Sequence, residues 1–305
     1  MNGGRRCRRR RKFALAGMVV VALSVAFAAG ASAAFPGRNG RIAFEQFTGS
    51  SYDINSIDPS GSNPTFLAAS SADELDQSYS ASGRSIVYAE ILVGSKSGYD
   101  IWRMRADGTG KKRLTGSSAD DQWPCYSPTG RQIAFMRDGD LWIMRSDGTH
   151  RRRIKNLTEG TRPAWSPNGK LIAYQDGPSF DQHDIYVVRP DGTHVLRLTH
   201  APKRANAGAD WSPSGHRIVF SRVVGGSADI YVMRPNGSDV HPLIATPKDE
   251  FDPAYSPNGK QIVYTSDDSP SGYANIFRAG ITAGQPHELS IESQNEYSPS
   301  WQPLG

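Results

Sequence analysis

The chain has 305 residues and a formal net charge of +5 at pH 7, a length that fits one large all-β domain as well as two ordinary domains. Seven of the 35 basic residues lie between Arg5 and Lys12, and the chain beyond residue 33 carries 28 basic and 30 acidic residues. That balance argues against a nucleic-acid partner, which requires a positive surface. The two cysteines, Cys7 and Cys125, are too few for a disulfide framework.

The first predicted element is an export leader over residues 1–33. A basic run at 5–12 precedes an apolar stretch at 13–30, and Ala-Ser-Ala at 31–33 then offers a small-x-small cleavage pattern. This order is typical of a secretory signal peptide, so we expect a protein exported to the periplasm or the cell exterior. The apolar stretch is nearly long enough to span a bilayer, which leaves an uncleaved membrane anchor as the alternative. The arginines leave Sec and twin-arginine export both open.

After the leader, one short motif recurs six times at intervals of 39 to 47 residues. An aromatic residue is followed by Ser, Pro and an x-Gly turn, with YSASG and WQPLG as the variant first and last copies. The copies begin at Tyr79, Tyr126, Trp165, Trp211, Tyr255 and Trp301. A period of roughly 40 to 50 residues with Gly and Pro turns indicates the blades of a β-propeller.

Each repeat contains the same four predicted strands in chain order. The aromatic residue ends the innermost strand, and we expect its ring to pack between blades. After the x-Gly turn comes a short apolar strand such as IAY from Ile172, and then an alternating strand such as DIYVM from Asp229. An Asp-Gly or similar turn reverses the chain into a polar outer strand. The regular recurrence of the opening Asp favours a structural role for it over a catalytic one.

The two ends of the repeat region complement each other. Residues 42–44 supply the second strand of a blade that lacks its first, and the segment around Trp301 is a first strand that lacks its second. Pairing them removes a free sheet edge. The sequence therefore predicts an all-β fold over residues 34–305, a six-bladed β-propeller of four-stranded antiparallel blades closed by its N- and C-terminal strands, and we expect a monomer.

The repeats resemble those of the TolB-type propellers, a group of WD-like β-propellers. Their pattern P-x-[WY]-S-P-x-G-[KR]-x-I-[AV]-[FY] is met by PAWSPNGKLIAY at 163–174 and PAYSPNGKQIVY at 253–264. The resemblance covers residues 34–305 and implies an exported propeller that binds partners. Because the leader runs almost directly into the first blade, we expect no separate N-terminal α/β domain. We also expect no hydrolase domain of the kind that related propellers gate in prolyl oligopeptidase-like peptidases.

Acidic residues recur where the chain leads into the predicted innermost strands. Asn206 and Gly160 occupy this position in two repeats, and the acidic residues are Glu74, Asp121, Glu250 and Glu296. We expect these side chains at one mouth of the central channel, where a ring of carboxylates could hold a cation, an amine or a basic peptide terminus. Alternatively, each carboxylate fixes its own loop through hydrogen bonds. Because Gly160 has no side-chain ligand at this position, the ring of carboxylates is incomplete, which argues against a symmetric metal site.

No catalytic or cofactor motif accompanies the repeats. Residues 94–98 read GSKSG rather than G-x-S-x-G, neither a P-loop nor a dinucleotide fingerprint occurs, and the histidines lack metal-ligand spacing. We therefore predict a non-catalytic scaffold, without metal or cofactor, that binds a protein or peptide at the channel mouth. The alternative is a carbohydrate-active lyase or glycosidase that uses the channel as its active site, because loops from several blades converge there.

Overall fold

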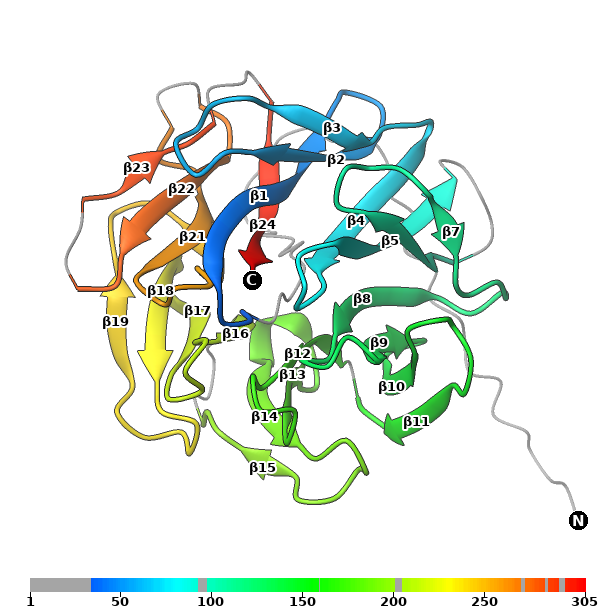
Figure 1. Cartoon of the computed structure of the whole chain (residues 1–305). Coiled ribbons are helices and arrows are strands. Elements are labelled where there is room, and N and C mark those ends of the chain that lie inside the picture. The colour runs from blue at the N-terminus through cyan, green and yellow to red at the C-terminus, as the bar shows by residue number, and fades with distance from the viewer. Residues whose placement is uncertain are drawn as a thin grey trace, which may run out of the picture.

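Six four-stranded antiparallel sheets are arranged radially about an axis (Figure 1). This computed structural model describes residues 34–92, 98–158, 160–200, 205–269, 272–282, 285–290 and 294–305. The predicted leader and most of the GSKSG segment lie outside these ranges. Within them the helical content is a single 3-10 turn, η1 (Phe180–Gln182).

The strands of each blade follow one another from the axis outward. Blade 1 contains β24 (Glu296–Leu304), β1 (Arg38–Phe47), β2 (Tyr52–Ile57) and β3 (Thr65–Ala68), and blade 2 contains β4 (Ala72–Tyr79), β5 (Ser85–Leu92), β6 (Asp100–Arg105) and β7 (Lys112–Arg113). Blade 3 contains β8 (Asp121–Tyr126), β9 (Gln132–Arg137), β10 (Asp140–Arg145) and β11 (Arg152–Lys155), and blade 4 contains β12 (Thr161–Trp165), β13 (Ile172–Asp176), β14 (Asp184–Val188) and β15 (Leu196–Arg197). Blade 5 contains β16 (Asn206–Trp211), β17 (Ile218–Val224), β18 (Ser227–Met233) and β19 (His241–Ile244), and blade 6 contains β20 (Glu250–Tyr255), β21 (Gln261–Ser266), β22 (Asn275–Gly280) and β23 (His287–Glu288).

The second strand of each blade is buried on both faces because its blade lies between two others. In β5, all four residues from Ile86 to Ala89 are fully buried. Alternate residues of a strand point to opposite faces of the sheet, so these side chains pack against different neighbouring blades. The hydrophobic core therefore consists of layers between blades, as the short apolar runs predict.

The aromatic residue of the repeated motif fills these layers. Trp165 packs with Phe135 and Met144 of the preceding blade, and the Trp211 indole nitrogen donates a hydrogen bond to the carbonyl oxygen of Ala164 at 3.2 Å. All six aromatic residues are at most 3% exposed. The prediction that these rings pack between blades is confirmed.

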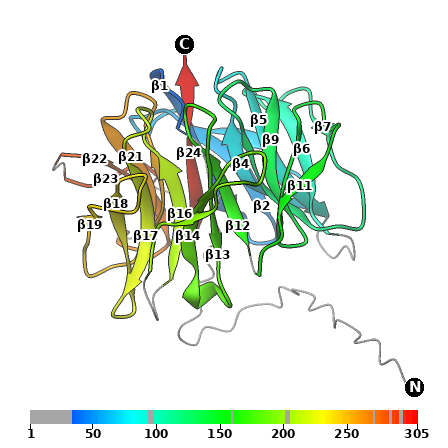
Figure 2. The ribbon, with the colours of Figure 1, turned by 90° about the horizontal axis from the view of Figure 1, so that it is seen from below.

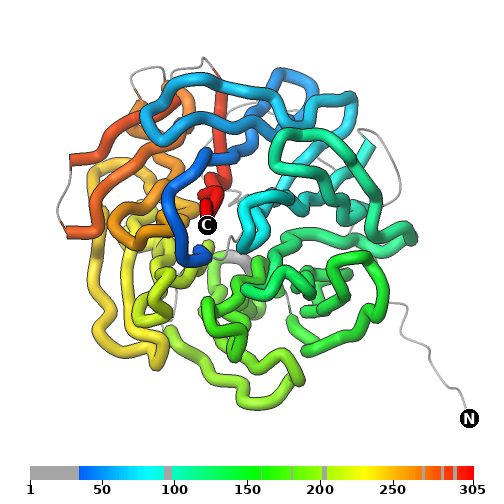
Figure 3. Tube along the Cα trace, viewed as in Figure 1, coloured from blue at the N-terminus to red at the C-terminus, as the bar shows by residue number. Residues whose placement is uncertain are grey.

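Ring closure by the two ends of the chain is also confirmed. β1 pairs with β24 in an antiparallel register that places Ile42 opposite Trp301 and Arg38 opposite Leu304. The trace runs once around the ring, so that its blue first strand lies beside its red last strand (Figure 3). In the side view, β24 runs along the axis between the blades (Figure 2).

Trp301→Ala tests the contribution of this closure. Trp301 packs with Ile42, Phe44 and Val263, so its truncation should open a cavity at the closing joint and lower the free energy of unfolding by about 3 to 5 kcal/mol. Urea denaturation measures the change. The control Phe66→Ala, on the outer edge with a 66% exposed ring, should leave the unfolding curve almost unchanged. Similar curves for the two variants would contradict the account of closure.

Candidate binding site at the channel mouth

The five predicted site residues lie at the start of the innermost strands. β8, β16, β20 and β24 begin with one of them, and β4 contains its copy as the third residue. The innermost strands contact one another around the axis, so these residues share one end of the ring, which we call the mouth. All five side chains are at most 1% exposed. They are Glu74, Asp121, Asn206, Glu250 and Glu296, and we call them the ring residues.

Two of these residues are held by arginines on the neighbouring strand. The Asp121 carboxylate accepts two hydrogen bonds from Arg137, at 2.6 and 2.7 Å. The Asn206 side-chain oxygen accepts one from the Arg222 Nε at 2.8 Å. In both blades the partner lies opposite the site residue in the strand register, so the contact secures the start of the innermost strand.

Two others are held by the loop that leads into their strand. Glu74 accepts a hydrogen bond from the Ser70 hydroxyl at 2.8 Å. Glu250 accepts two hydrogen bonds from Thr246, one from the hydroxyl and one from the backbone N–H of Thr246 at 3.3 Å. Burial raises the pKa of Glu74 to about 7 and that of Glu250 to about 6. These carboxyl groups therefore exchange protons near neutral pH.

Glu296 completes the set and accepts a hydrogen bond from the Gln46 side chain at 3.5 Å. All five residues thus have a partner in their own blade or its leading loop. These contacts are those expected if each side chain fixes its own loop. Binding of a ligand by the ring stays a prediction.

In four of the six blades, the residue just before the ring residue has a role that the sequence analysis missed. The Asp120 carboxylate accepts a hydrogen bond from the backbone N–H of Tyr99 in the preceding blade at 2.9 Å, and Asn295 accepts one from Ala274 in the same way. The residues that tie adjacent blades in this manner are Asp73, Asp120, Asp249 and Asn295. The signal was a run of two acidic or amide residues in four of the six repeats, at 73–74, 120–121, 249–250 and 295–296.

Two residues after each ring residue, and after Gly160 in blade 4, the innermost strand contains a bulge with a positive φ between 50° and 61°. This backbone conformation costs a residue other than Gly about 1 to 3 kcal/mol, and bulges of this kind re-aim a side chain. The six residues are Asp76, Trp123, Arg162, Gly208, Asp252 and Ser298. The backbone therefore repeats in every blade, whereas the side chains do not.

Four charged side chains from four blades meet at the axis below the mouth, and we call them the axial cluster. They are Glu45, Asp76, Arg162 and Asp252, each at most 5% exposed. The Arg162 guanidinium donates to Asp252 at 3.1 Å, although these residues belong to blades 4 and 6. Glu45 accepts a hydrogen bond from the backbone N–H of Asp76 at 2.7 Å. The cluster thus joins groups that lie far apart in the sequence.

The axial cluster holds three carboxyl groups beside one guanidinium. Burial raises the pKa of Asp76 and of Asp252 to about 7, even though the positive charge of Arg162 opposes the shift. Burial and the two aspartates also raise the pKa of Glu45 well above its usual value. The arrangement can therefore bind a cationic group or exchange protons near neutral pH.

Aromatic rings line one side of the mouth. The Tyr297 ring lies 6.2 Å from that of Phe251 and 6.3 Å from that of Tyr52, which in turn lies 5.1 Å from Phe47. Three of these four rings are only partly buried, Phe251 being the exception. They give the mouth an apolar flank beside its carboxylates.

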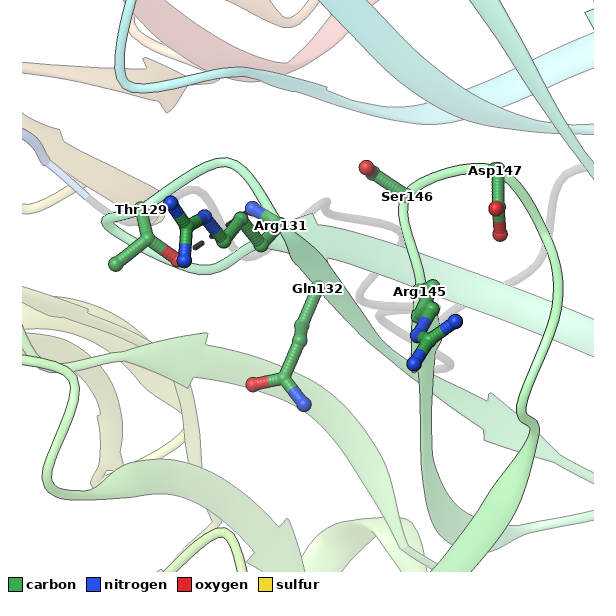
Figure 4. A pocket seen from close by; sticks show the side chains of 6 residues that line it. All are labelled: Thr129, Arg131, Gln132, Arg145, Ser146 and Asp147. Carbon is green, nitrogen blue, oxygen red and sulfur yellow. Dashed lines mark hydrogen bonds between the residues drawn. The ribbon is translucent and has the colours of Figure 1, made fainter.

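A shallow hollow of about 530 Å³ lies at the opposite end of blade 3 (Figure 4). Its lining includes Arg131, Arg145 and Asp147, the last of which accepts hydrogen bonds from the hydroxyl and the N–H of Thr149. The hollow lies between two turns at the surface and is separate from the axial cluster.

Among the side chains that the structure describes, no group of three His, Cys, Asp or Glu is placed to hold a metal ion. In the same residues, no helix has the length and apolar character needed to cross a membrane.

Arg162→Met tests the electrostatics of the axial cluster. Without the guanidinium, the buried carboxylates lose their counter-charge, which should cost about 3 to 5 kcal/mol of unfolding free energy at pH 8. Asp76 and Asp252 have folded pKa values raised to about 7, so their contribution to stability is lost as pH rises through that value. The loss caused by Arg162→Met should therefore shrink at pH 5.5, where both groups take up protons.

Urea denaturation of Arg162→Met at the two pH values provides the measurement. Arg217→Met is the control, because its partner Asp239 is exposed and such surface pairs contribute little. An equal loss for Arg162→Met at both pH values would contradict the proton uptake.

Comparison with known proteins agrees with this architecture. The family described as "TolB beta propeller domain" matches residues 139–305. The chain is 24% identical over 151 residues to "Uncharacterized peptidase YuxL" of Bacillus subtilis, a match that covers 48% of this chain and 20% of that protein. The chain thus spans only a fraction of that relative's length.

Solved structures share the fold. TolB from Acinetobacter baumannii superposes with a TM-score of 0.74 at 21% identity, covering 87% of this chain and 67% of that one. An oligogalacturonate lyase in complex with manganese gives a TM-score of 0.58 at 13% identity, covering 86% of this chain and 77% of that one. At these identities the similarity concerns the fold alone. Because the family match extends over more than half of the sequence, the chain belongs to the TolB β-propeller family.

Proposed function

We propose that this protein is an exported, non-catalytic propeller scaffold that binds a protein or peptide partner at the mouth. Residues 1–33 would direct export to the periplasm or the cell exterior and then be removed. The observation that carries the proposal is the composition of the mouth, where carboxylates from several blades lie beside a partly exposed aromatic flank.

The outer rim of the mouth supplies the accessible negative charge. The loops that follow the second strands carry the exposed Asp138, Asp267 and Asp268, and the partly exposed Asp176 ends the second strand β13. Behind this rim, the ring residues add Glu74, Asp121, Glu250 and Glu296, with Asn206 in blade 5. Carboxylates gathered at one end of the molecule attract a basic partner and raise its rate of association.

The aromatic flank favours a macromolecular partner over a small ligand. Tyr and Phe are enriched at the cores of protein interfaces, and Phe47, Tyr52 and Tyr297 remain partly accessible. The axial cluster, in contrast, is almost completely enclosed. A basic peptide segment that lies across the mouth would contact the acidic rim and the aromatic rings together.

A second candidate function is a carbohydrate-active enzyme of the lyase or glycosidase type. The axial cluster favours it, because Asp76 and Asp252 have pKa values near 7, a range suited to general acid and base catalysis. Arg162 could neutralise an acidic sugar. The enclosure of these groups is the reason for ranking this candidate second.

Charge substitution at the rim tests the scaffold proposal. Tagged wild type and the quadruple variant Asp138→Asn, Asp176→Asn, Asp267→Asn and Asp268→Asn are used to recover partners from envelope extracts of the source organism. The matched control makes the same charge change at the opposite end, with Asp107→Asn, Asp147→Asn, Asp191→Asn and Asp239→Asn. We expect the rim variant to lose at least nine-tenths of the recovered partner, roughly a tenfold loss of affinity, and the control to retain it. Equal recovery by both variants would remove the mouth as the binding site.

A turnover assay separates the two candidates. Wild type and Asp252→Asn are incubated with acidic and neutral oligosaccharides, and unsaturated or newly reducing products are measured. The scaffold proposal predicts no difference between the two proteins. Turnover that depends on Asp252 would reverse the order of the candidates.

A further inference from the structure

The segment at Ala34 and Phe35 enters the end of the ring opposite the mouth. Both residues are buried, at 5% and 2% exposure. Phe35 packs in the apolar cluster that contains Val87 and Tyr126, whereas Ala34 packs in the cluster of Val219. These contacts reach blades on different sides of the axis, so the segment is anchored among the innermost strands before β1 begins.

The backbone nitrogen of Ala34 lies against a buried carboxylate. It donates a hydrogen bond to Asp210 Oδ1 at 3.2 Å, and Asp210 Oδ2 accepts one from the N–H of Tyr255 at 2.7 Å. Asp210 is 1% exposed. Among the residues that the structure describes, no Lys, Arg or His side chain forms an ion pair with it.

Keeping this buried carboxylate ionised costs free energy. Neutral N–H donors offset only part of the cost of removing a carboxylate from water, and a buried charge is normally compensated by an opposite charge. Burial accordingly raises the pKa of Asp210 well above its usual value while the nitrogen of Ala34 is a neutral amide. A positive charge at the Ala34 nitrogen would supply the missing compensation.

The cleavage pattern at residues 31–33 independently marks the bond that precedes Ala34. We propose that an export peptidase hydrolyses the Ala33–Ala34 bond and that the new α-ammonium of Ala34 becomes the buried counter-ion of Asp210. Hydrolysis adds one water across the peptide bond, leaving a carboxylate on Ala33 and an amine on Ala34. That amine is mostly protonated at neutral pH, because an α-amino group has a pKa of about 8.

Removal of the leader and stabilisation of the propeller would then be linked. In the uncleaved chain the same nitrogen belongs to a peptide bond and carries no charge. After cleavage, Phe35 and Ala34 hold the ammonium in place through packing, so little side-chain entropy is lost in forming the pair. The inference rests on the leader proposed above and does not depend on partner binding.

Defined N-termini test the ion pair directly. Residues 34–305, which include every described strand of the closed ring, are prepared with a free Ala34 amine, with an acetylated Ala34, and with Gly-Ser ahead of Ala34. We expect the free amine to lower the unfolding equilibrium constant at least tenfold, equivalent to about 1.4 kcal/mol, compared with both blocked forms. Equal stability of the three chains would overturn the proposal.

The same three N-termini in an Asp210→Asn background control for steric effects. Without the carboxylate, the ratio between free and blocked forms should fall close to one. A ratio that persists would assign the difference to crowding and overturn the ion pair. If Asp210→Asn does not fold, labelling of the wild-type α-amine with an amine-selective reagent replaces it: we expect protection of at least tenfold in the native state, and labelling at the denatured rate would overturn the proposal.

Intact-mass analysis of the chain from its source organism tests the processing step. A mature chain that begins at Ala34 supports the proposal, and any other first residue or a retained leader overturns it. Because the defined N-termini require neither export nor a partner, failure of the ion pair is distinguishable from failure of the proposed function.

Discussion

Antiparallel pairing of β1 with β24 joins the two ends of the chain, and the position of every group at the axis depends on it. The joint brings Trp301 into the same blade as Ile42 and leaves no open gap between the first and last repeats. Arg162 of blade 4 reaches Asp252 of blade 6 across the axis because closure holds the blades around one centre. An open array of blades would have neither a mouth nor an axial cluster.

Within the closed propeller, residues that recur in the repeats have structural roles, whereas residues that differ between repeats are candidates for function. In four blades, an acidic or amide residue at the start of the innermost strand holds the preceding blade through a backbone N–H group. The bulge that follows has a positive φ in all six blades but carries different side chains. Function is expected where the symmetry of the side chains breaks, because a constant backbone there presents a set of groups that is specific to this protein.

The fold was predictable from the sequence because turn residues and apolar strands recur with a regular period. The aromatic rings between blades, the four strands per repeat and the closing pair all follow from local signals such as Pro, Gly and alternation. The position of the five ring residues at the start of the innermost strands was predictable for the same reason. Their burial was not, because it depends on partners such as Arg137 and Thr246 that occur in only some blades.

The axial cluster could not be predicted from the repeats. Arg162 and Asp252 lie 90 residues apart. They occupy the same position in their repeats, and the residue type at that position differs from repeat to repeat. Their contact across the axis arises from the bulge and from the angle between blades 4 and 6. The buried contact of Ala34 with Asp210 was hidden in the same way, since Asp210 occupies the variable position before Trp211 and Ala34 precedes the first strand.

Site-specific photocrosslinking tests the central claim, that the mouth is the binding surface, most directly. A photoreactive phenylalanine analogue is placed at Tyr297 in the aromatic flank, or at Phe66 on the outer edge of blade 1, and the protein is irradiated in its own cells. The account predicts covalent adducts from Tyr297 and none from Phe66. Adducts from the outer edge alone would contradict it.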